Sequence, residues 1–148
     1  MPTLKKVQIK LKPWGREIWF AQTDAPNAKY AGKILEIKRG HRYSLQYHEK
    51  KRETQYILKG KALFTFGTNR GSLQEKILNE GDKMDILPYT IHRLEALEDV
   101  LVVEVSTPDL NDVVKLEDDY GRKGKGNNEK LDKKLAKKSR LSYKKSKS

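Results

Sequence analysis

The chain has 148 residues, of which 36% are hydrophobic and 35% charged, and this length is typical of one domain. It contains no cysteine, which excludes a disulfide framework and a thiolate zinc site. We expect a cytoplasmic protein, because the first residues lack a secretory signal and no stretch approaches the roughly 18 to 20 apolar residues that span a bilayer.

Short segments rich in Val, Ile, Leu, Tyr and Phe follow one another along most of the chain, which is typical of β-strands. In chain order they are residues 7–11, 17–21, 32–38, 42–48, 54–60, 61–67, 83–88 and 100–106. Turn residues separate them, and no stretch before residue 120 has a helical period over ten residues. The pattern predicts an all-β fold, either a sandwich or a closed jelly-roll barrel.

The net charge of +12 is concentrated at the C-terminal end. Residues 121–148 contain twelve basic and two acidic residues, which leaves twenty basic and eighteen acidic residues in 1–120. A nucleic-acid-binding domain carries its basic surface on the fold, so this distribution argues against that function for residues 1–120. We predict a β-barrel domain at 1–120 and a disordered Lys-rich tail at 121–148, since like charges repel along any helix there. The tail would solubilise the chain or contact anionic surfaces weakly.

Candidate metal ligands lie in residues 40–60 and in one later segment. Strand alternation directs Gln46 and His48 to the same face, and Glu53 begins the next strand after a short connection. His92 follows a turn and begins another strand. An amide oxygen, two imidazoles and a carboxylate suit zinc, manganese, cobalt, nickel or iron. The spacing of histidine and glutamate alone is also common in surface pairs.

Two glycine-bounded patterns resemble the motifs of the cupin superfamily. The first, G-x5-Q-x-H-x4-E-x6-G over residues 40–60, has glutamine in place of the motif's first histidine. The second, over residues 81–92, has Tyr89 where that motif has glycine, and tyrosine does not adopt a positive φ cheaply.

A narrower resemblance is to the cupin domain of type II mannose-6-phosphate isomerases, especially short single-domain members. It is carried by KPWGREIW at 12–19, HRYSLQYH at 41–48, IHRLEA at 91–96 and LEDDYGR at 116–122. The resemblance implies a cupin double-stranded β-helix (jelly-roll barrel) that forms a homodimer. It also implies a metal-dependent isomerase that converts mannose 6-phosphate to fructose 6-phosphate. Such an enzyme would hold one divalent ion, and zinc is the first choice. The two-domain enzymes have His-Trp after the glutamate, where this chain has Thr54 and Gln55, which puts the sugar in doubt.

The resemblance and strand parity together suggest roles for further residues. The candidates for phosphate contact are Arg42, placed by parity on the face of the predicted ligands, with Lys51 and Arg122. The catalytic candidates are Lys33, Arg93 and Glu104. The proton-transfer group stays open between Lys33, Glu53 and Glu104, and Glu104 either supports a ligand histidine or faces solvent.

Three other functions stay open. A cupin can bind a sugar or sugar phosphate without turnover, and the residues after Glu53 favour that alternative. An iron-dependent oxygenase is disfavoured, because the chain has only three histidines. A nucleic-acid binder acting through residues 121–148 would bind in a salt-sensitive way.

Overall fold

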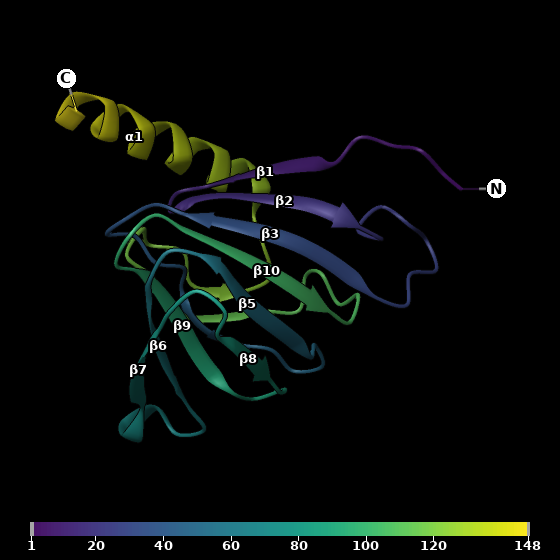
Figure 1. Ribbon diagram of the computed structural model, residues 1–148, viewed down its shortest axis with the longest axis horizontal. Coiled ribbons are helices and arrows are strands. Elements are labelled where there is room, and N and C mark those ends of the chain that lie inside the picture. Colours follow the sequence, from purple (N-terminus) through teal and green to yellow (C-terminus); the bar gives the residue numbers. More distant parts are fainter. Residues whose placement is uncertain (1, 148) are drawn as a thin grey trace.

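A computed structural model describes the backbone of residues 2–147 and the side chains of residues 2–139. Two antiparallel sheets face each other in these residues (Figure 1). In spatial order, the first sheet contains β1 (Gln8–Lys12), β2 (Gly15–Ala21), β3 (Ala31–Ile37), β10 (Val100–Ser106), β5 (Glu53–Lys59) and β8 (Lys83–Ile86). The second contains β12 (Gly124–Lys125), β11 (Val114–Glu117), β4 (Leu45–Tyr47), β9 (Ile91–Ala96), β6 (Ala62–Gly67) and β7 (Gln74–Leu78). A 3₁₀ turn, η1 (Arg70–Ser72), joins β6 to β7, and α1 (Glu129–Lys147) follows the last strand.

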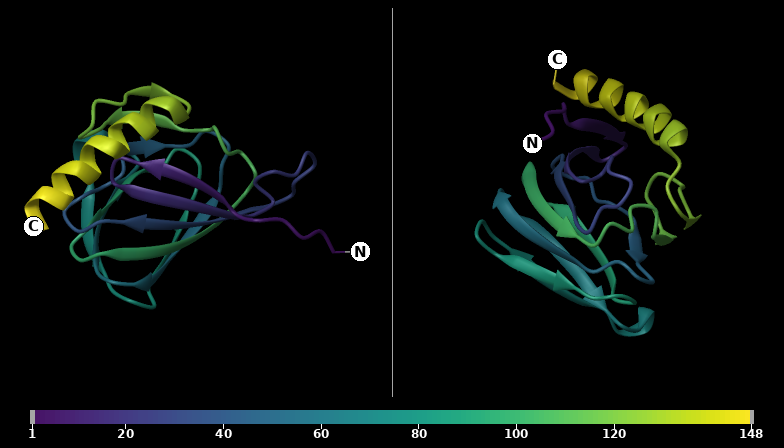
Figure 2. Two further views of the ribbon diagram at one scale, coloured as in Figure 1. Left: turned by 90° about the horizontal axis from the view of Figure 1, so that it is seen from above. Right: turned by 90° about the vertical axis from the view of Figure 1, so that its right-hand side faces the viewer.

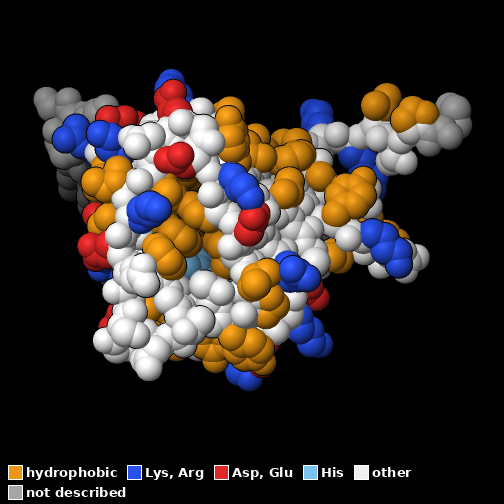
Figure 3. All heavy atoms as spheres, turned by 60° about the horizontal axis from the view of Figure 1, so that its bottom comes forward, with side chains coloured by type: hydrophobic (Ala, Val, Ile, Leu, Met, Phe, Trp, Pro, Cys, Tyr) orange, Lys and Arg blue, Asp and Glu red, His pale blue; other side chains and the backbone are white. Residues whose placement is uncertain are grey.

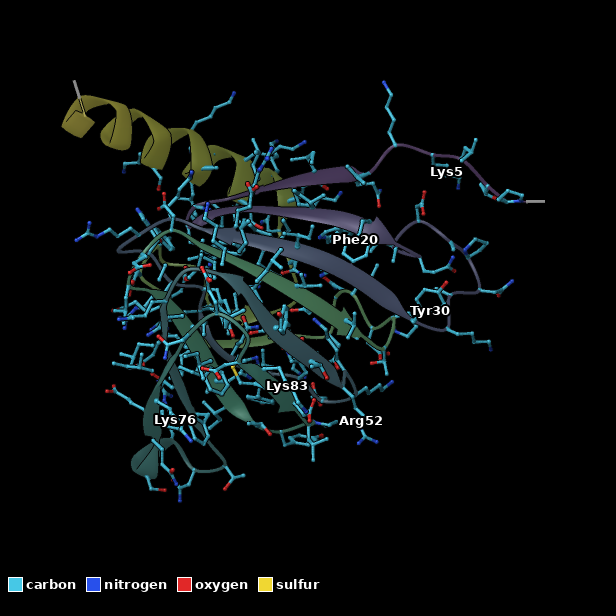
Figure 4. All side chains as sticks on the ribbon, in the orientation of Figure 1. Lys5, Phe20, Tyr30, Arg52, Lys76 and Lys83 are labelled. Atoms are coloured by element: carbon cyan, nitrogen blue, oxygen red, sulfur yellow. The ribbon has the colours of Figure 1, made fainter. Side chains whose placement is uncertain are left out.

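Apolar side chains from the inner faces of both sheets fill the space between them (Figure 4). The core includes Leu35, Ile37, Ile57, Phe64, Ile86, Leu94, Val100 and Val102. Trp14 closes one end of this core and packs edge-on against Tyr43, with ring centroids 6.5 Å apart. Residues two apart in a strand share a face, so a polar residue two positions from a core residue, such as Glu104 after Val102, also points to the interior.

The strand prediction was correct for seven of the eight segments and too long for the other. Residues 42–48 form only the three-residue strand β4, while Arg42 makes an isolated bridge to Glu95. Residues 43 and 44 make no ladder pair, so the alternation of β4 does not extend back to Arg42. The prediction missed β7, β11 and β12, whose sequences are more polar than those of the inner strands.

Tyr89 takes the left-handed conformation that glycine takes in the resembled motif, with φ of +63°. This conformation costs a non-glycine residue about 1 kcal/mol or more. Two contacts offset the strain: the Tyr89 amide donates to the His48 carbonyl at 2.7 Å, and its ring stacks on Tyr47 at 5.9 Å. The turn before His92 therefore forms despite the missing glycine.

Residues 121–139 belong to the segment predicted to be a disordered tail, and in the structure they lie against the barrel. Helix α1 packs against β1 (Figure 2), and Asp132 and Ala136 are buried on its inner side. The Asn128 side chain caps the first turn, because its Oδ1 accepts the Leu131 amide at 3.0 Å. Buried ion pairs of Asp132 and this cap offset the repulsion among the lysines. The side chains predicted to be disordered beyond residue 139 lie outside the described residues.

Candidate metal centre and its cavity

Three side chains from both sheets converge in the interior. His48 directly follows β4, His92 is the second residue of β9, and Glu53 begins β5 in the other sheet. Their potential ligand atoms lie within 4.8 Å of one another, and all three residues are buried. Glu53 Oε1 lies 3.7 Å from His48 Nε2 and 3.3 Å from His92 Nε2.

Both imidazoles are held in the tautomer that a metal ligand needs. The Nδ1 of His48 lies 2.5 Å from the Asp112 carbonyl, and the Nδ1 of His92 lies 2.9 Å from the Thr90 carbonyl. A carbonyl only accepts, so each Nδ1 carries a hydrogen, and Nε2 is left as the nitrogen that can bind a metal. Neither Nε2 has a hydrogen-bond partner, although both are buried and face a carboxylate oxygen. A cation between these acceptors would satisfy them, so the residues fit a divalent metal.

Gln46, the fourth predicted ligand, lies beside this group. It pairs with His92 across β4 and β9 and lines the same cavity as His48. Its Oε1 accepts the Ser44 hydroxyl at 2.7 Å. An amide oxygen has two lone pairs, so this bond leaves it able to bind a metal, and its assignment as a ligand stays a prediction.

A buried ionic network supports Glu53 from the side away from the histidines. Lys51 Nζ lies 2.8 Å from Glu53 Oε2 and 3.0 Å from Glu104 Oε2. Gln55 Nε2 donates to Glu104 Oε1 at 3.1 Å and to Glu53 Oε1 at 3.3 Å. Burial raises the pKa of Glu53, but the net shift is well below its ordinary value, and the Lys51 ammonium group is the largest opposing influence. Glu53 is therefore a carboxylate at neutral pH, as a ligand requires.

Asp112 fixes the loop that carries His48. Its carboxylate accepts the backbone amides of Glu49, Lys50 and Lys51 at 3.1, 2.7 and 2.8 Å. Burial raises the pKa of Asp112, and the three amide bonds more than compensate, so the net shift is downward. The same residue supplies the carbonyl that orients His48, so one aspartate orders both the loop and the ligand.

Lys33 faces the cavity from β3, opposite Glu104 of β10. Its Nζ lies 3.5 Å from Glu17 Oε1 and 4.5 Å from the centre of the Trp19 ring. Burial raises the pKa of Glu17, but the Lys33 and Lys12 ammonium groups outweigh burial and lower it from 4.5 to about 2. The sequence prediction missed Glu17, although it shares strand parity with Trp19 in a segment predicted as β.

The low pKa of Glu17 predicts a specific pH dependence of stability. A depressed folded-state pKa stabilises the fold above the unfolded value of 4.5, and this stabilisation is lost as pH falls toward about 2. Glu17→Gln should lower the free energy of unfolding by about 3 kcal/mol at neutral pH, and the two proteins should converge in acid. Urea unfolding between pH 7 and pH 3 measures this, with exposed Glu98→Gln as control. A difference that stays constant down to pH 3 would contradict the assignment.

Basic side chains surround the rest of the cavity, which has a volume of about 60 Å³. They are Lys12, Lys33, Lys51, Lys115 and Arg122. Each is less than a tenth exposed, so these positive charges lie inside the fold. The same lining includes Glu17, Glu104 and Asp112, so five cations face three carboxylates, and this excess favours a ligand that carries negative charge.

Arg42 and Arg93 do not reach the cavity, and the parity expectation for Arg42 is corrected. Arg42 forms a surface ion pair with Asp119 at 2.8 Å, because the backbone turns it away before β4 begins. Arg93 is buried, but its guanidinium donates to the carbonyls of Tyr43 and Glu117 at 3.0 and 3.1 Å. Tyr43 packs its ring 6.0 Å from that of His92.

The comparisons with known proteins agree with this architecture. Residues 3–118 match the family described as mannose-6-phosphate isomerase C-terminal. The chain belongs to this family. It is a cupin relative of the type II mannose-6-phosphate isomerases, as its motifs predict. No curated protein sequence matches the chain.

Solved structures share the fold at low identity. The capsular polysaccharide assembling protein CapF of Staphylococcus aureus is 18% identical, with a TM-score of 0.61 over 77% of this chain and 33% of CapF. Oxalate decarboxylase of Lactobacillus farciminis is 18% identical, with a TM-score of 0.64 over 74% of this chain and 33% of that chain. KdgF of Halomonas sp. is 21% identical, with a TM-score of 0.56 over 70% of this chain and 86% of KdgF. The chain thus spans about a third of the first two proteins. The all-β cupin fold is confirmed.

The surface carries charges of both signs. On the face drawn in Figure 3, basic and acidic side chains are interspersed among hydrophobic ones. Within the described residues, no helix is both long enough and apolar enough to cross a membrane.

Proposed function

We propose that this protein is a metal-dependent sugar-phosphate aldose–ketose isomerase, with mannose 6-phosphate to fructose 6-phosphate as the leading reaction. The observation that carries the proposal is the convergence of two unpartnered imidazole Nε2 atoms on Glu53, beside a cavity that His48 and five basic residues line. The family supports the sugar-phosphate substrate.

His48, Glu53 and His92 would hold the metal, with Gln46 as a fourth ligand. A divalent ion polarises a carbonyl and stabilises the charge of an enediolate. Zinc is our first choice, and manganese, cobalt, nickel or iron also suit these donors.

The remaining cavity residues orient the substrate and move a proton between its first two carbons. Lys33 and Glu104 are the catalytic candidates that line the cavity. Lys51 is committed to two carboxylates, and although burial lowers its pKa, those carboxylates raise that pKa far above its ordinary value. Lys51 therefore stays protonated and supplies charge rather than acting as a base. Arg122 is at the rim and suits the phosphate.

The test is metal analysis of the purified protein combined with a coupled isomerase assay on a panel of hexose and pentose phosphates. We expect activity that a chelator removes and a divalent metal restores. A metal-loaded protein that turns over none of these sugar phosphates would exclude the proposal.

A non-catalytic sugar-phosphate-binding cupin is the second candidate. It is favoured by Gln55, which stands where the two-domain enzymes have tryptophan and whose amide is committed to Glu53 and Glu104. Thr54 points away from the cavity and donates to Asp85 at 2.8 Å. Ligand-induced thermal stabilisation without turnover would identify this function.

We also propose that the protein is a homodimer, formed through the outer face of the first sheet. One uncharged row crosses five paired strands there: Ile9, Ile18, Ile34, Val103 and Tyr56. Nearby Phe20 and Tyr30, labelled in Figure 4, are 46% and 56% exposed. A second copy presents the same face, so a two-fold pairing buries both rows at once.

Charge placed in that row should prevent the pairing. Tyr56→Glu should convert the dimer to a monomer in analytical ultracentrifugation, because an unpaired carboxylate would be buried at the centre of the interface. Ile77→Glu, an equally drastic change at a 54% exposed residue of the second sheet, should leave the dimer intact. A wild-type protein that is monomeric at micromolar concentration would contradict the proposal.

A further inference from the structure

Helix α1 contacts two basic residues that line the cavity through one buried carboxylate. Asp132 is 2% exposed, although it belongs to a helix whose neighbouring residues are mostly lysines. Its Oδ2 lies 2.8 Å from Lys12 Nζ and its Oδ1 lies 3.2 Å from Arg122 Nη1. One carboxylate from the C-terminal helix thus neutralises two rim cations from separate strands or loops.

The cations at this corner have unequal compensation besides Asp132, and among the described residues Lys12 Nζ has only Glu17 Oε2, at 4.0 Å, as a second carboxylate partner. Arg122 uses Nε and Nη2 for Asp118, four residues before it, and has Nη1 left for Asp132. Lys115 donates to the Gly126 carbonyl and to Asn127 Oδ1, which are neutral groups. Burial lowers the pKa of Lys115, and the adjacent Arg122 and Lys12 charges help to bring it to about 8. Without Asp132, the three cations Lys12, Lys115 and Arg122 would face, within the described part of the chain, only Asp118 and the more distant Glu17, so positive charge would be in excess by one.

The cavity is small while α1 is docked. Its volume of about 60 Å³ is far below the roughly 300 to 1,000 Å³ of small-molecule sites. The rim on this side is made by Arg122 and Asn127, which lie in the segment leading into α1. A ligand that reaches Lys12 and Arg122 must therefore displace the contacts of this segment.

The packing of α1 makes such a displacement inexpensive. Among its described side chains, Ala136 is the buried apolar residue, and Leu131 and Leu135 are only partly buried. A cavity of about 650 Å³ lies between the helix at Ala136 and Ser139 and the strand ends beneath it. The ion pair of Lys10 with Glu129 at 3.2 Å is exposed and contributes little. The buried anchor is therefore Asp132.

We propose that Lys12 and Arg122 form an anion subsite for a phosphate monoester, and that Asp132 is its internal competitor, so that ligand binding releases α1 from β1. Arginine and lysine at a buried rim suit phosphate oxygens as they suit a carboxylate. The proposed function identifies the ligand class on which this inference rests. In addition, the C-terminal helix sets the affinity of this subsite for phosphate.

The test measures binding of inorganic phosphate by the full chain, without turnover. Asp132→Asn keeps the shape and removes the charge, so the affinity for phosphate in calorimetry should rise by about tenfold, since the competing state is removed. Glu129→Gln, on the same helical turn but outside the rim, is the matched control and should change the affinity little. Unchanged or weaker phosphate binding by folded Asp132→Asn would overturn the proposal.

Hydrogen exchange of the wild-type protein gives an independent measurement if the variant does not fold. Phosphate should increase exchange at the α1 amides while the strands keep their protection. Protection of α1 by phosphate would mean that the helix closes over the anion, which contradicts competition. Both measurements use protein from which a chelator has removed the metal, so they do not depend on isomerase activity. The isomerase assay, in turn, does not depend on the release of α1.

Discussion

Replacing His92 or His48 by alanine should abolish metal binding and reduce isomerase activity by at least about 100-fold, since loss of a direct ligand costs more than the 10- to 100-fold of an outer-shell partner. Each imidazole contributes one of the converging nitrogen atoms, and neither Nε2 has another partner to occupy it. The metal content of the purified variants, measured by mass spectrometry, and the coupled assay provide the two readouts.

His41 supplies the matched control for this prediction. It is the third histidine of the chain, and its Nδ1 lies 2.6 Å from the Tyr120 hydroxyl, away from the metal cavity. His41→Ala should keep full metal occupancy and most of the activity. Retention of stoichiometric metal by folded His92→Ala would exclude the site, and equal loss in all three variants would indicate a general effect on folding.

The predicted metal ligands and the observed convergence agree because local pattern determines their placement. His48 and Gln46 are two residues apart at the end of β4, and Glu53 is fixed at the start of β5 by the short loop that Asp112 orders. His92 pairs with Gln46 in the ladder. For these residues, strand periodicity and turn glycines carry enough information to place the side chains.

The errors arise where tertiary contacts override local pattern. Arg42 lies outside the regular ladder, so extending the strand alternation from Gln46 back to residue 42 placed the Arg42 side chain on the wrong face. Asp132 looks like an isolated acid in a Lys-rich tail, and its importance depends on Lys12, 120 residues earlier in the chain. Glu17 and Lys33 likewise meet only after β2 and β3 pair. Sequence periodicity contains no information about such ion pairs.

Lys51→Met should destabilise the apo protein by about 3 to 5 kcal/mol, because it leaves two buried carboxylates without their common cation. Lys51 Nζ lies within 3.0 Å of both Glu53 and Glu104, and all three residues are less than a tenth exposed. Urea unfolding of the chelated protein at neutral pH measures the effect. Lys50→Met, at the exposed neighbouring lysine, should change stability by less than about 0.5 kcal/mol.

Two further measurements separate this electrostatic effect from a loss of packing. Lys51→Met/Glu104→Gln should recover part of the stability, since one of the two unpaired charges is gone. A divalent metal should stabilise Lys51→Met more than wild type, because a cation bound by Glu53 replaces the missing ammonium charge there. A Lys51→Met protein within about 1 kcal/mol of wild type would show that the buried charges find another partner. If a divalent metal stabilises Lys51→Met no more than it stabilises wild type, the charge of Lys51 is not coupled to the metal centre. Together these outcomes show whether the Lys51 ion pairs and the metal ligands act as one electrostatic unit.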